Sequence, residues 1–208
     1  MELSVIDSKG KATSKKVKLS KDVFGITPNE HAIYLDVKQY LANQRQGTSS
    51  TRERSEIRGS RRKIRKQKGS GGARFGDIKN PLFRGGGRVF GPRPQVHGFK
   101  LNKKLKKVAR RSALSLMASE KSITIVEDLK FDAPKTSSYV AFLDSLKLTD
   151  SKTLLVLDEQ DKNIYLSSRN LKGANVVTAS QLSTYGILNA NNLLLSESSV
   201  ATIEKSLS

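Results

Sequence analysis

Apolar and polar residues follow a regular pattern along most of the chain, except in its middle. After residue 122, short apolar runs without polar alternation are typical of strands covered on both faces of a sheet. These runs are Ile123–Val126, Thr153–Leu157, Asn175–Val177 and Asn192–Leu195. Helical spacing follows at Thr136–Leu148, Asp161–Leu171, Ser180–Tyr185 and Glu197–Leu207. This rhythm predicts a three-layer α/β fold, with a largely parallel sheet of about four strands and helices on both faces.

The first 43 residues predict two short strands and a helix. The strands are expected at Glu2–Ile6 and Lys16–Leu19. Thr27-Pro28-Asn29-Glu30 predicts the helix start, with Thr27 as N-cap, proline at the first position and glutamate closing a capping box. Spacing along this helix predicts one buried stripe, formed by Ile33, Val37, Tyr40 and Leu41.

A second helix is expected from Asn102 to about Ser119. Its predicted apolar stripe consists of Leu105, Val108, Ala109, Ser112 and Leu116. Another face carries the cations Lys103, Lys106, Lys107 and Arg110. Cations in the first turn oppose the helix dipole, so we interpret this face as a phosphate contact rather than as a solvated surface. Gly173 and Gly186 stand where C-caps of later helices are expected.

Between these helices, Gln44–Gly98 shows no sustained period. It holds 11 of the 15 Gly, 3 of the 5 Pro and only ten apolar residues in 55. So little apolar burial cannot offset a backbone entropy cost of about 1–2 kcal/mol per residue. A disordered linker is one interpretation. Aromatic residues interleaved with arginines favour the other, a segment that becomes ordered on RNA. We therefore predict a globular α/β domain at residues 1–43 and 99–208, and an extended basic loop at residues 44–98.

The charge is concentrated in the same region. The chain of 208 residues has 38 Lys+Arg against 19 Asp+Glu, a net charge of +19. Gln44–Arg111 contains 22 of these cations and 3 of the acids, so the rest of the chain is balanced at 16 of each. A localised excess of this size indicates a polyanionic partner that contacts one part of the molecule.

Signals for other functions are absent from the sequence. There is no Cys, and neither a signal peptide nor an apolar run long enough to span a bilayer is found, so we expect an intracellular, soluble protein. His31 and His97 lack metal-ligand spacing, and the Gly-rich runs complete no phosphate-loop motif, so no metal or cofactor is expected. Asp158–Asp161 follows a strand and could mimic a carboxylate site; a solvated turn before a helix explains it as well.

Seven motifs, in this order, resemble one known family. They are Arg45-Gln46-Gly47-Thr48, Ser55-Glu56-Ile57-Arg58-Gly59-Ser60, Gln67-Lys68-Gly69-Ser70-Gly71 with Ala73-Arg74, Arg84-Gly85-Gly86-Gly87, Phe90-Gly91-Pro92-Arg93-Pro94, Leu101-Asn102-Lys103-Lys104, and Arg111-Ser112-Ala113-Leu114-Ser115. Ala133-Pro134-Lys135 and Ser168-Arg169-Asn170-Leu171 extend the likeness over nearly the whole chain. Together they resemble the bacterial large-subunit ribosomal protein four family.

This resemblance implies a non-catalytic structural protein of the ribosome, located in the cytoplasm. The implied partners are 23S rRNA, neighbouring large-subunit proteins at the exit tunnel and the nascent chain, with no membrane and no homo-oligomer. The loop would aid subunit assembly, and its tip would help to form the narrowest part of the tunnel, near the macrolide site. Family members usually carry Lys-Pro-Trp where this chain has Lys63-Ile64-Arg65-Lys66.

Charge, stacking chemistry and the resemblance together define the candidate RNA-binding residues. In the loop they are Arg45, Gln46, Thr48, Arg52, Arg54, Arg58, Arg61, Arg62, Lys63, Arg65, Lys66, Lys68, Arg74, Phe75, Lys79, Arg84, Arg88, Phe90 and Arg93. On the following helix they are Lys103, Lys104, Lys107, Arg110 and Arg111.

Two rival hypotheses come from other functional classes. A basic regulator that binds its own mRNA or DNA would share the charge, and competition between duplex DNA and structured rRNA at fixed salt would distinguish it. A small-molecule α/β enzyme using the Asp158–Asp161 edge would need a nucleophile–base pair or a cofactor motif, and the sequence has neither.

Overall fold

The chain divides into two compact units in the computed structural model, which describes residues 1–207. One unit comprises Met1–Leu41 and the chain from Lys100 onward, and the other is Ala42–Phe99. The final residue of the predicted globular segment, 208, lies outside the described residues.

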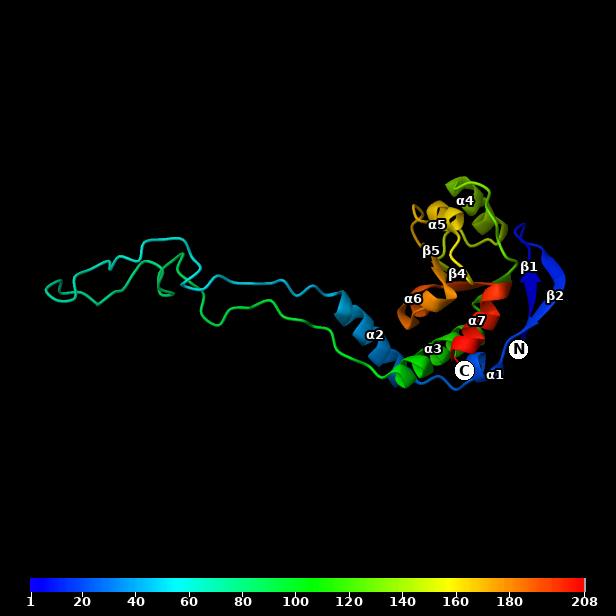
Figure 1. Ribbon diagram of the computed structural model, residues 1–208, viewed down its shortest axis with the longest axis horizontal. Coiled ribbons are helices and arrows are strands. Elements are labelled where there is room, and N and C mark those ends of the chain that lie inside the picture. The colour runs from blue at the N-terminus through cyan, green and yellow to red at the C-terminus, as the bar shows by residue number, and fades with distance from the viewer. Residues whose placement is uncertain (208) are drawn as a thin grey trace. The chain divides into compact units, whose positions relative to one another are not determined.

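A six-stranded sheet forms the centre of the first unit (Figure 1). Its strand order is β2-β1-β3-β6-β4-β5. The strands are β1 (Glu2–Ile6), β2 (Ala12–Lys18), β3 (Ile123–Val126), β4 (Thr153–Leu157), β5 (Ala174–Thr178) and β6 (Asn192–Ser196). Only β1 and β2 pair antiparallel, and every other pairing is parallel.

The predicted α/β class and the largely parallel sheet are confirmed, but the predicted number of about four strands was two too low. The N-terminal hairpin adds the missing pair. Val5 lies opposite Ile125 in a short parallel pairing, which joins β1 to β3. This non-local pairing cannot be read from the local pattern of the first residues, which predicts strands without saying which sheet they join.

Helices flank the sheet on both faces. They are α1 (Lys21–Phe24), α2 (Glu30–Gln44), α3 (Lys103–Ser119), α4 (Thr136–Ser145), α5 (Lys162–Ser168), α6 (Thr184–Asn189) and α7 (Glu197–Leu207), with a 3-10 turn η1 (Ala179–Gln181) before α6.

Two hydrophobic cores follow from this arrangement, one on each face of the sheet. In β4, Leu154 and Val156 pack into the core shared with α1, α3, α6 and α7, whereas Leu155 and Leu157 pack into the core shared with α4 and α5. Figure 1 shows α4 and α5 together on one side and α3, α6 and α7 on the other. Each fully buried side chain of this size stabilises the fold by about 1.5–3 kcal/mol, which explains the unbroken apolar runs.

The start of α2 differs from the prediction. Asn29, not Thr27, caps the helix, because its Oδ1 accepts a hydrogen bond from the Ala32 backbone N–H at 3.0 Å. The predicted stripe was also wrong, since the buried positions of α2 are Ala32 and Gln39. Leu41 is 43% exposed. Apolar residues at helical spacing do not by themselves ensure burial, because the neighbouring elements decide which face is covered.

Two further helices depart from their predicted limits. The 180–185 prediction covers the end of η1 and only the start of α6, whose N-cap is Ser183. Gly186 therefore lies inside α6 and is not a C-cap. In α3, burial is concentrated in the second half, where Ala113, Leu114 and Met117 join the core. The predicted stripe residue Val108 is 37% exposed.

Candidate nucleic-acid interface

Beyond the last residues of α2, the second unit is a long hairpin. Its two arms contain neither helix nor strand and are joined by single backbone hydrogen bonds. Four of these bonds cross between the arms, with N···O distances of 2.9–3.1 Å. They run from Gln95 to Gly47, from Thr51 to Pro92, from Arg88 to Arg52 and from Ile64 to Gly76. The loop therefore has a register of its own despite its scarcity of apolar residues. Figure 1 shows the two arms running out and back.

Glycine is required where the arms approach most closely. A Cβ atom at Gly87 would run into the backbone of Arg54 on the opposite arm. At Gly47, which has φ +63, a Cβ atom would run into the carbonyl oxygen of Gln95. Side chains at these two positions would separate the arms, so the glycines permit contacts between backbones that larger residues would prevent.

All three acids of the loop are paired with its own arginines. Arg93 lies 2.6 Å from a carboxylate oxygen of Glu53 and 2.9 Å from one of Glu56. Arg54 lies 3.0 Å from Oδ1 of the buried Asp77, without the alignment of a hydrogen bond. Two of the candidate RNA-binding residues therefore also hold the loop together.

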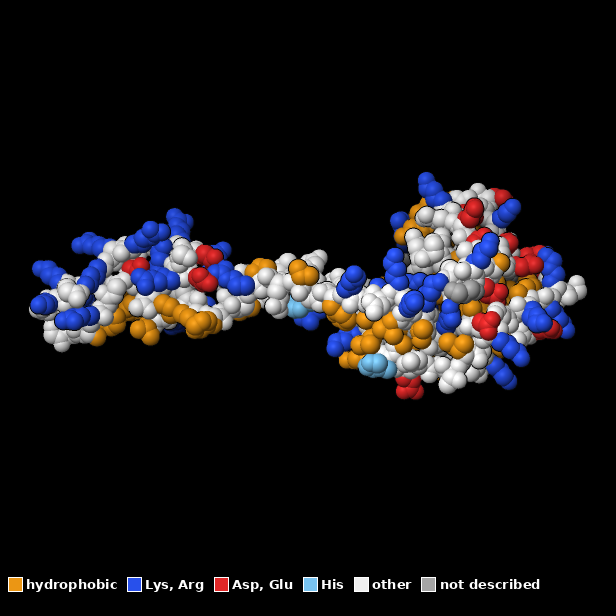
Figure 2. Space-filling view, turned by 60° about the horizontal axis from the view of Figure 1, so that its bottom comes forward, with side chains coloured by type: hydrophobic (Ala, Val, Ile, Leu, Met, Phe, Trp, Pro, Cys, Tyr) orange, Lys and Arg blue, Asp and Glu red, His pale blue; other side chains and the backbone are white. Residues whose placement is uncertain are grey.

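The remaining loop cations are largely presented to solvent. None of the following forms an ion pair within residues 1–207, and each is exposed: Arg58, Arg61, Arg62, Lys63, Arg65, Lys66, Lys68, Arg74, Arg84 and Arg88. The exposed candidates Arg45, Gln46, Thr48 and Arg52 continue this surface along the first arm. Figure 2 shows Lys and Arg side chains along one edge of the loop and apolar side chains along the opposite edge. Unpaired cations on an extended segment are available for phosphate groups.

The candidate aromatic residues have different environments. Phe75 is half-buried, with its ring 5.3 Å from that of Phe83 and the Arg65 guanidinium 5.4 Å from its centroid. Phe90 is fully exposed and has φ +54. Lys79, expected as a surface cation, is only 8% exposed. Gly59 of the opposite arm lies close to the Lys79 side chain. A contact between positions this far apart leaves no signal in the local sequence.

The cations of α3 also divide into two groups. Lys103, Lys104 and Lys107 are exposed in its first half. Arg110 and Arg111 are partly buried, and Arg111 donates a hydrogen bond to the carbonyl oxygen of Leu207 at the end of α7. Arg111 thus satisfies a free carbonyl at a helix C-terminus, a structural role that the charge count alone did not suggest.

The carboxylates at the sheet edge have a structural role as well. Oδ1 of Asp161 accepts hydrogen bonds from the backbone N–H groups of Asn163, at 2.7 Å, and Ile164, at 3.4 Å, and so caps α5. A small cavity of about 170 Å³ lies beside it, lined in part by Tyr165 and Gln181. Among residues 1–207 no cluster of three or more His, Cys, Asp or Glu could hold a metal ion. Over the same range, no helix is long and apolar enough to cross a membrane.

Comparison with known proteins agrees with the resemblance seen in the motifs. The model of the ribosomal protein L4/L1 family matches residues 17–206. The chain is 60% identical to large ribosomal subunit protein uL4 of Flavobacterium johnsoniae over the full length of both proteins. It is 58% identical to the uL4 protein of Parabacteroides distasonis, over 99% of this chain and 98% of that protein. On this evidence, the chain belongs to the ribosomal protein L4/L1 family.

Proposed function

We propose that this structural constituent of the large ribosomal subunit, which is not an enzyme, binds 23S rRNA through the Ala42–Phe99 loop. One observation supports the proposal above the others. The net charge of the chain resides in the loop and α3, where the loop acids are paired internally and most of the cations are exposed.

The expected mode of binding is electrostatic. Each cation that neutralises a phosphate releases condensed counterions, so affinity should fall steeply with salt concentration. Glycines let the backbone pass where rRNA helices crowd together, and the loop acts as a strut between them. The globular unit, with its two cores, would hold the base of this strut.

Within the large ribosomal subunit, the loop would have two further roles. We expect a single copy of the chain to aid subunit assembly by crossing rRNA. The loop tip would line the nascent-peptide exit tunnel beside neighbouring large-subunit proteins and the nascent chain. The tip segment Arg61–Lys68 supports this assignment, because it carries six cations in eight residues near the midpoint of the loop.

Deleting Arg52–Pro94 tests the proposal. The deletion should leave a cooperatively folded domain, because the two cores lie outside the loop. Its affinity for 23S rRNA, measured by filter binding across a salt series, should be much lower than that of the full chain. Unchanged affinity would contradict binding of rRNA through the charges of the loop.

A charge-neutral variant serves as the matched control. Replacing all six cations of Arg61–Lys68 by Gln retains the length of the loop but removes phosphate contacts. The slope of log K against log salt should become shallower by about 4–5 units. If the deletion weakens binding while this variant retains the original slope, then the tip cations do not contact phosphate.

A further inference from the structure

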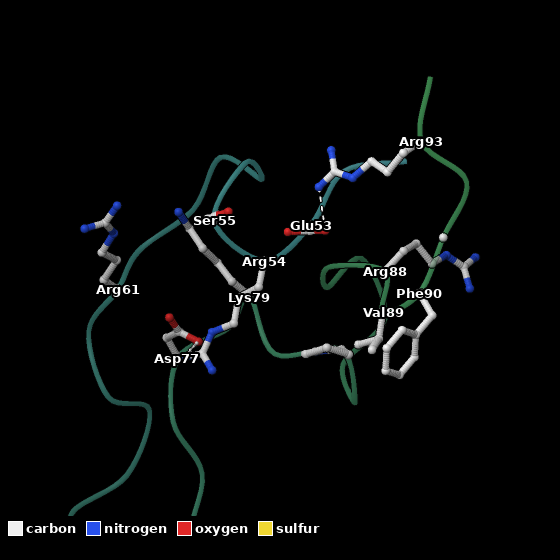
Figure 3. Close-up of a pocket in the computed structure, with 12 residues that line it drawn as sticks. Glu53, Arg54, Ser55, Arg61, Asp77, Lys79, Arg88, Val89, Phe90 and Arg93 are labelled. Atoms are coloured by element: carbon white, nitrogen blue, oxygen red, sulfur yellow. Dashed lines mark ion pairs between the residues drawn. The ribbon is translucent and has the colours of Figure 1, made fainter. Parts of the chain in front are cut away.

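A pocket of about 840 Å³ lies between the arms of the loop, and Arg61 at the start of the tip segment contributes to its lining. We call it the loop pocket. Arg54 lines it from the first arm, and Asp77, Lys79, Arg88, Val89 and Phe90 line it from the second. Figure 3 shows the Arg54 guanidinium beside the Asp77 carboxylate on one side of this pocket, and Val89, Phe90 and Arg88 on the other. The volume falls within the range of about 300–1,000 Å³ typical of small-molecule sites.

Lys79 gives this pocket a cation whose aliphatic stem is buried. It is 92% buried, and within residues 1–207 it has neither a hydrogen bond nor an ion pair. The nearby carboxylate of Asp77 is paired with Arg54 instead. The stem of Lys79 is buried while its ammonium group remains accessible from the pocket, so the pocket can present this cation to an anionic group from outside the chain.

Phe90 supplies an apolar surface at the same pocket. Its side chain is fully exposed, while its backbone adopts φ +54, a conformation that side chains rarely take. By contrast, the rings of Phe75 and Phe83 in the same loop pack against each other. A strained residue that holds an aromatic ring in solvent indicates a ligand that will cover the ring.

We propose that the loop pocket takes one unstacked nucleotide, with its base against the ring of Phe90 and its phosphate beside Lys79 and Arg88. Apolar side chains on one wall and unpaired cations on another match the two halves of a nucleotide, whereas a bare phosphate would leave Val89 and Phe90 uncovered. The inference rests on the proposed RNA binding and deepens it. The same chemistry is offered by a nucleotide bulged from RNA and by a free nucleoside monophosphate.

Two RNA hairpins of matched sequence test this inference with the full-length protein. One is fully paired, and the other carries a single bulged 2-aminopurine, whose fluorescence is quenched by stacking. The wild-type protein should bind the bulged hairpin about tenfold more tightly and quench its fluorescence. Phe90→Ala should abolish both the preference and the quenching, and Phe90→Tyr should retain them. Lys79→Gln should reduce the preference.

Residues outside the loop pocket provide the controls. Leu82 is 82% exposed and does not line the pocket, so Leu82→Ala should change neither affinity. Arg84→Ala should weaken binding to both hairpins equally, because it removes a general phosphate contact. An excess of AMP that displaces the 2-aminopurine hairpin would identify the free nucleotide as a ligand; no displacement would assign the pocket to RNA alone.

The outcomes separate this inference from the proposed function. Equal binding of the two hairpins, or a preference that survives Phe90→Ala, overturns the nucleotide pocket and leaves phosphate binding intact. Failure to bind either hairpin at low salt would overturn the pocket and also count against RNA binding by the loop.

Discussion

Single side chains hold the loop in register through charge rather than through a core. The hydrogen bond from Arg93 lowers the pKa of Glu56, and hydrogen bonds to Glu53 and Glu56 raise the pKa of Arg93. The folded-state pKa of Glu56 is lower than its ordinary value of 4.5. The ion pair of Glu56 therefore stabilises the folded loop above pH 4.5, and this stabilisation is lost as the pH falls through the lowered pKa. Where the loop is ordered, the ion pairs of Arg93 with Glu53 and Glu56 are therefore intact at neutral pH.

Tyr139 allows a test at the residue scale in the globular unit. It is completely buried, its hydroxyl has no hydrogen-bond partner within residues 1–207, and burial raises its pKa well above the usual range. Tyr139→Phe should therefore leave the free energy of unfolding unchanged or raise it by about 1 kcal/mol. Tyr139→Ala should lower it by about 3–5 kcal/mol. Denaturant unfolding measures both, and a large loss in Tyr139→Phe would reveal an unseen partner for the hydroxyl.

Lys68→Glu tests the proposed tunnel role of the tip. One reversed charge among 22 cations should scarcely affect incorporation into subunits, measured by sedimentation. At a tunnel constriction, however, it should alter macrolide sensitivity or nascent-chain stalling. Lys172→Glu, on an exposed lysine of the globular unit, is the matched control and should change neither. Normal incorporation without either change in Lys68→Glu would leave only the strut role.

At the scale of elements, the buried parallel strands were more predictable than the helix limits, whereas the edge strand β2 begins at Ala12, four residues before its predicted start at Lys16. Apolar runs such as Thr153–Leu157 identify doubly covered strands, because burial on both faces leaves no polar alternation. Helix limits depend on which of several nearby polar side chains caps the first turn. Asn29 replaces Thr27 as the N-cap of α2. The N-cap of α6 is Ser183, so this helix starts later than the predicted range from Ser180. When two candidate N-cap residues lie within a few positions of each other, tertiary contacts decide which one caps the helix. The local sequence pattern does not contain these contacts.

The cap of α5 gives a prediction at this scale. Asp161→Ala removes two hydrogen bonds to backbone N–H groups and should lower the free energy of unfolding by about 0.5–2 kcal/mol. Asp158→Ala removes a nearby carboxylate that caps no helix and should have little effect. Thermal unfolding of both variants measures the difference. Equal losses would mean that the Asp161 cap contributes nothing specific to stability.

For the whole molecule, the distribution of charge was readable from the sequence, but the interior of the loop was not. A count of Lys and Arg locates the basic segment at once. The buried Lys79, the crossing of Gly87 over Arg54 and the exposed ring of Phe90 are features of the folded loop. Gly87 lies against Arg54, 33 positions away, and Lys79 lies near Gly59, 20 positions away. No periodic core fixes these contacts, so neither spacing nor composition reveals them. The nucleotide pocket could be inferred only from the structure.

Limited proteolysis compares the loop in the free protein and in the particle. We predict that Gln44–Gly98 is disordered in the free protein and ordered on rRNA, because its few apolar residues cannot offset the entropy of ordering. Trypsin should cut the free protein in this segment first and spare it in assembled subunits. A free loop that resists trypsin as well as the globular unit does would contradict this prediction, and would indicate that the arm-crossing contacts suffice to order it.

The strand order of the sheet also has a consequence for synthesis of the chain. β6 lies between β3 and β4, although Asn192–Ser196 is the last strand to be made. The hairpin side of the sheet cannot join β4 and β5 until that strand is available. Roughly 100 residues separate the end of the loop from β6. Their synthesis takes about 5–20 s at usual elongation rates. During synthesis, the basic loop is therefore exposed to cellular RNA for several seconds before the sheet of the globular unit can be completed.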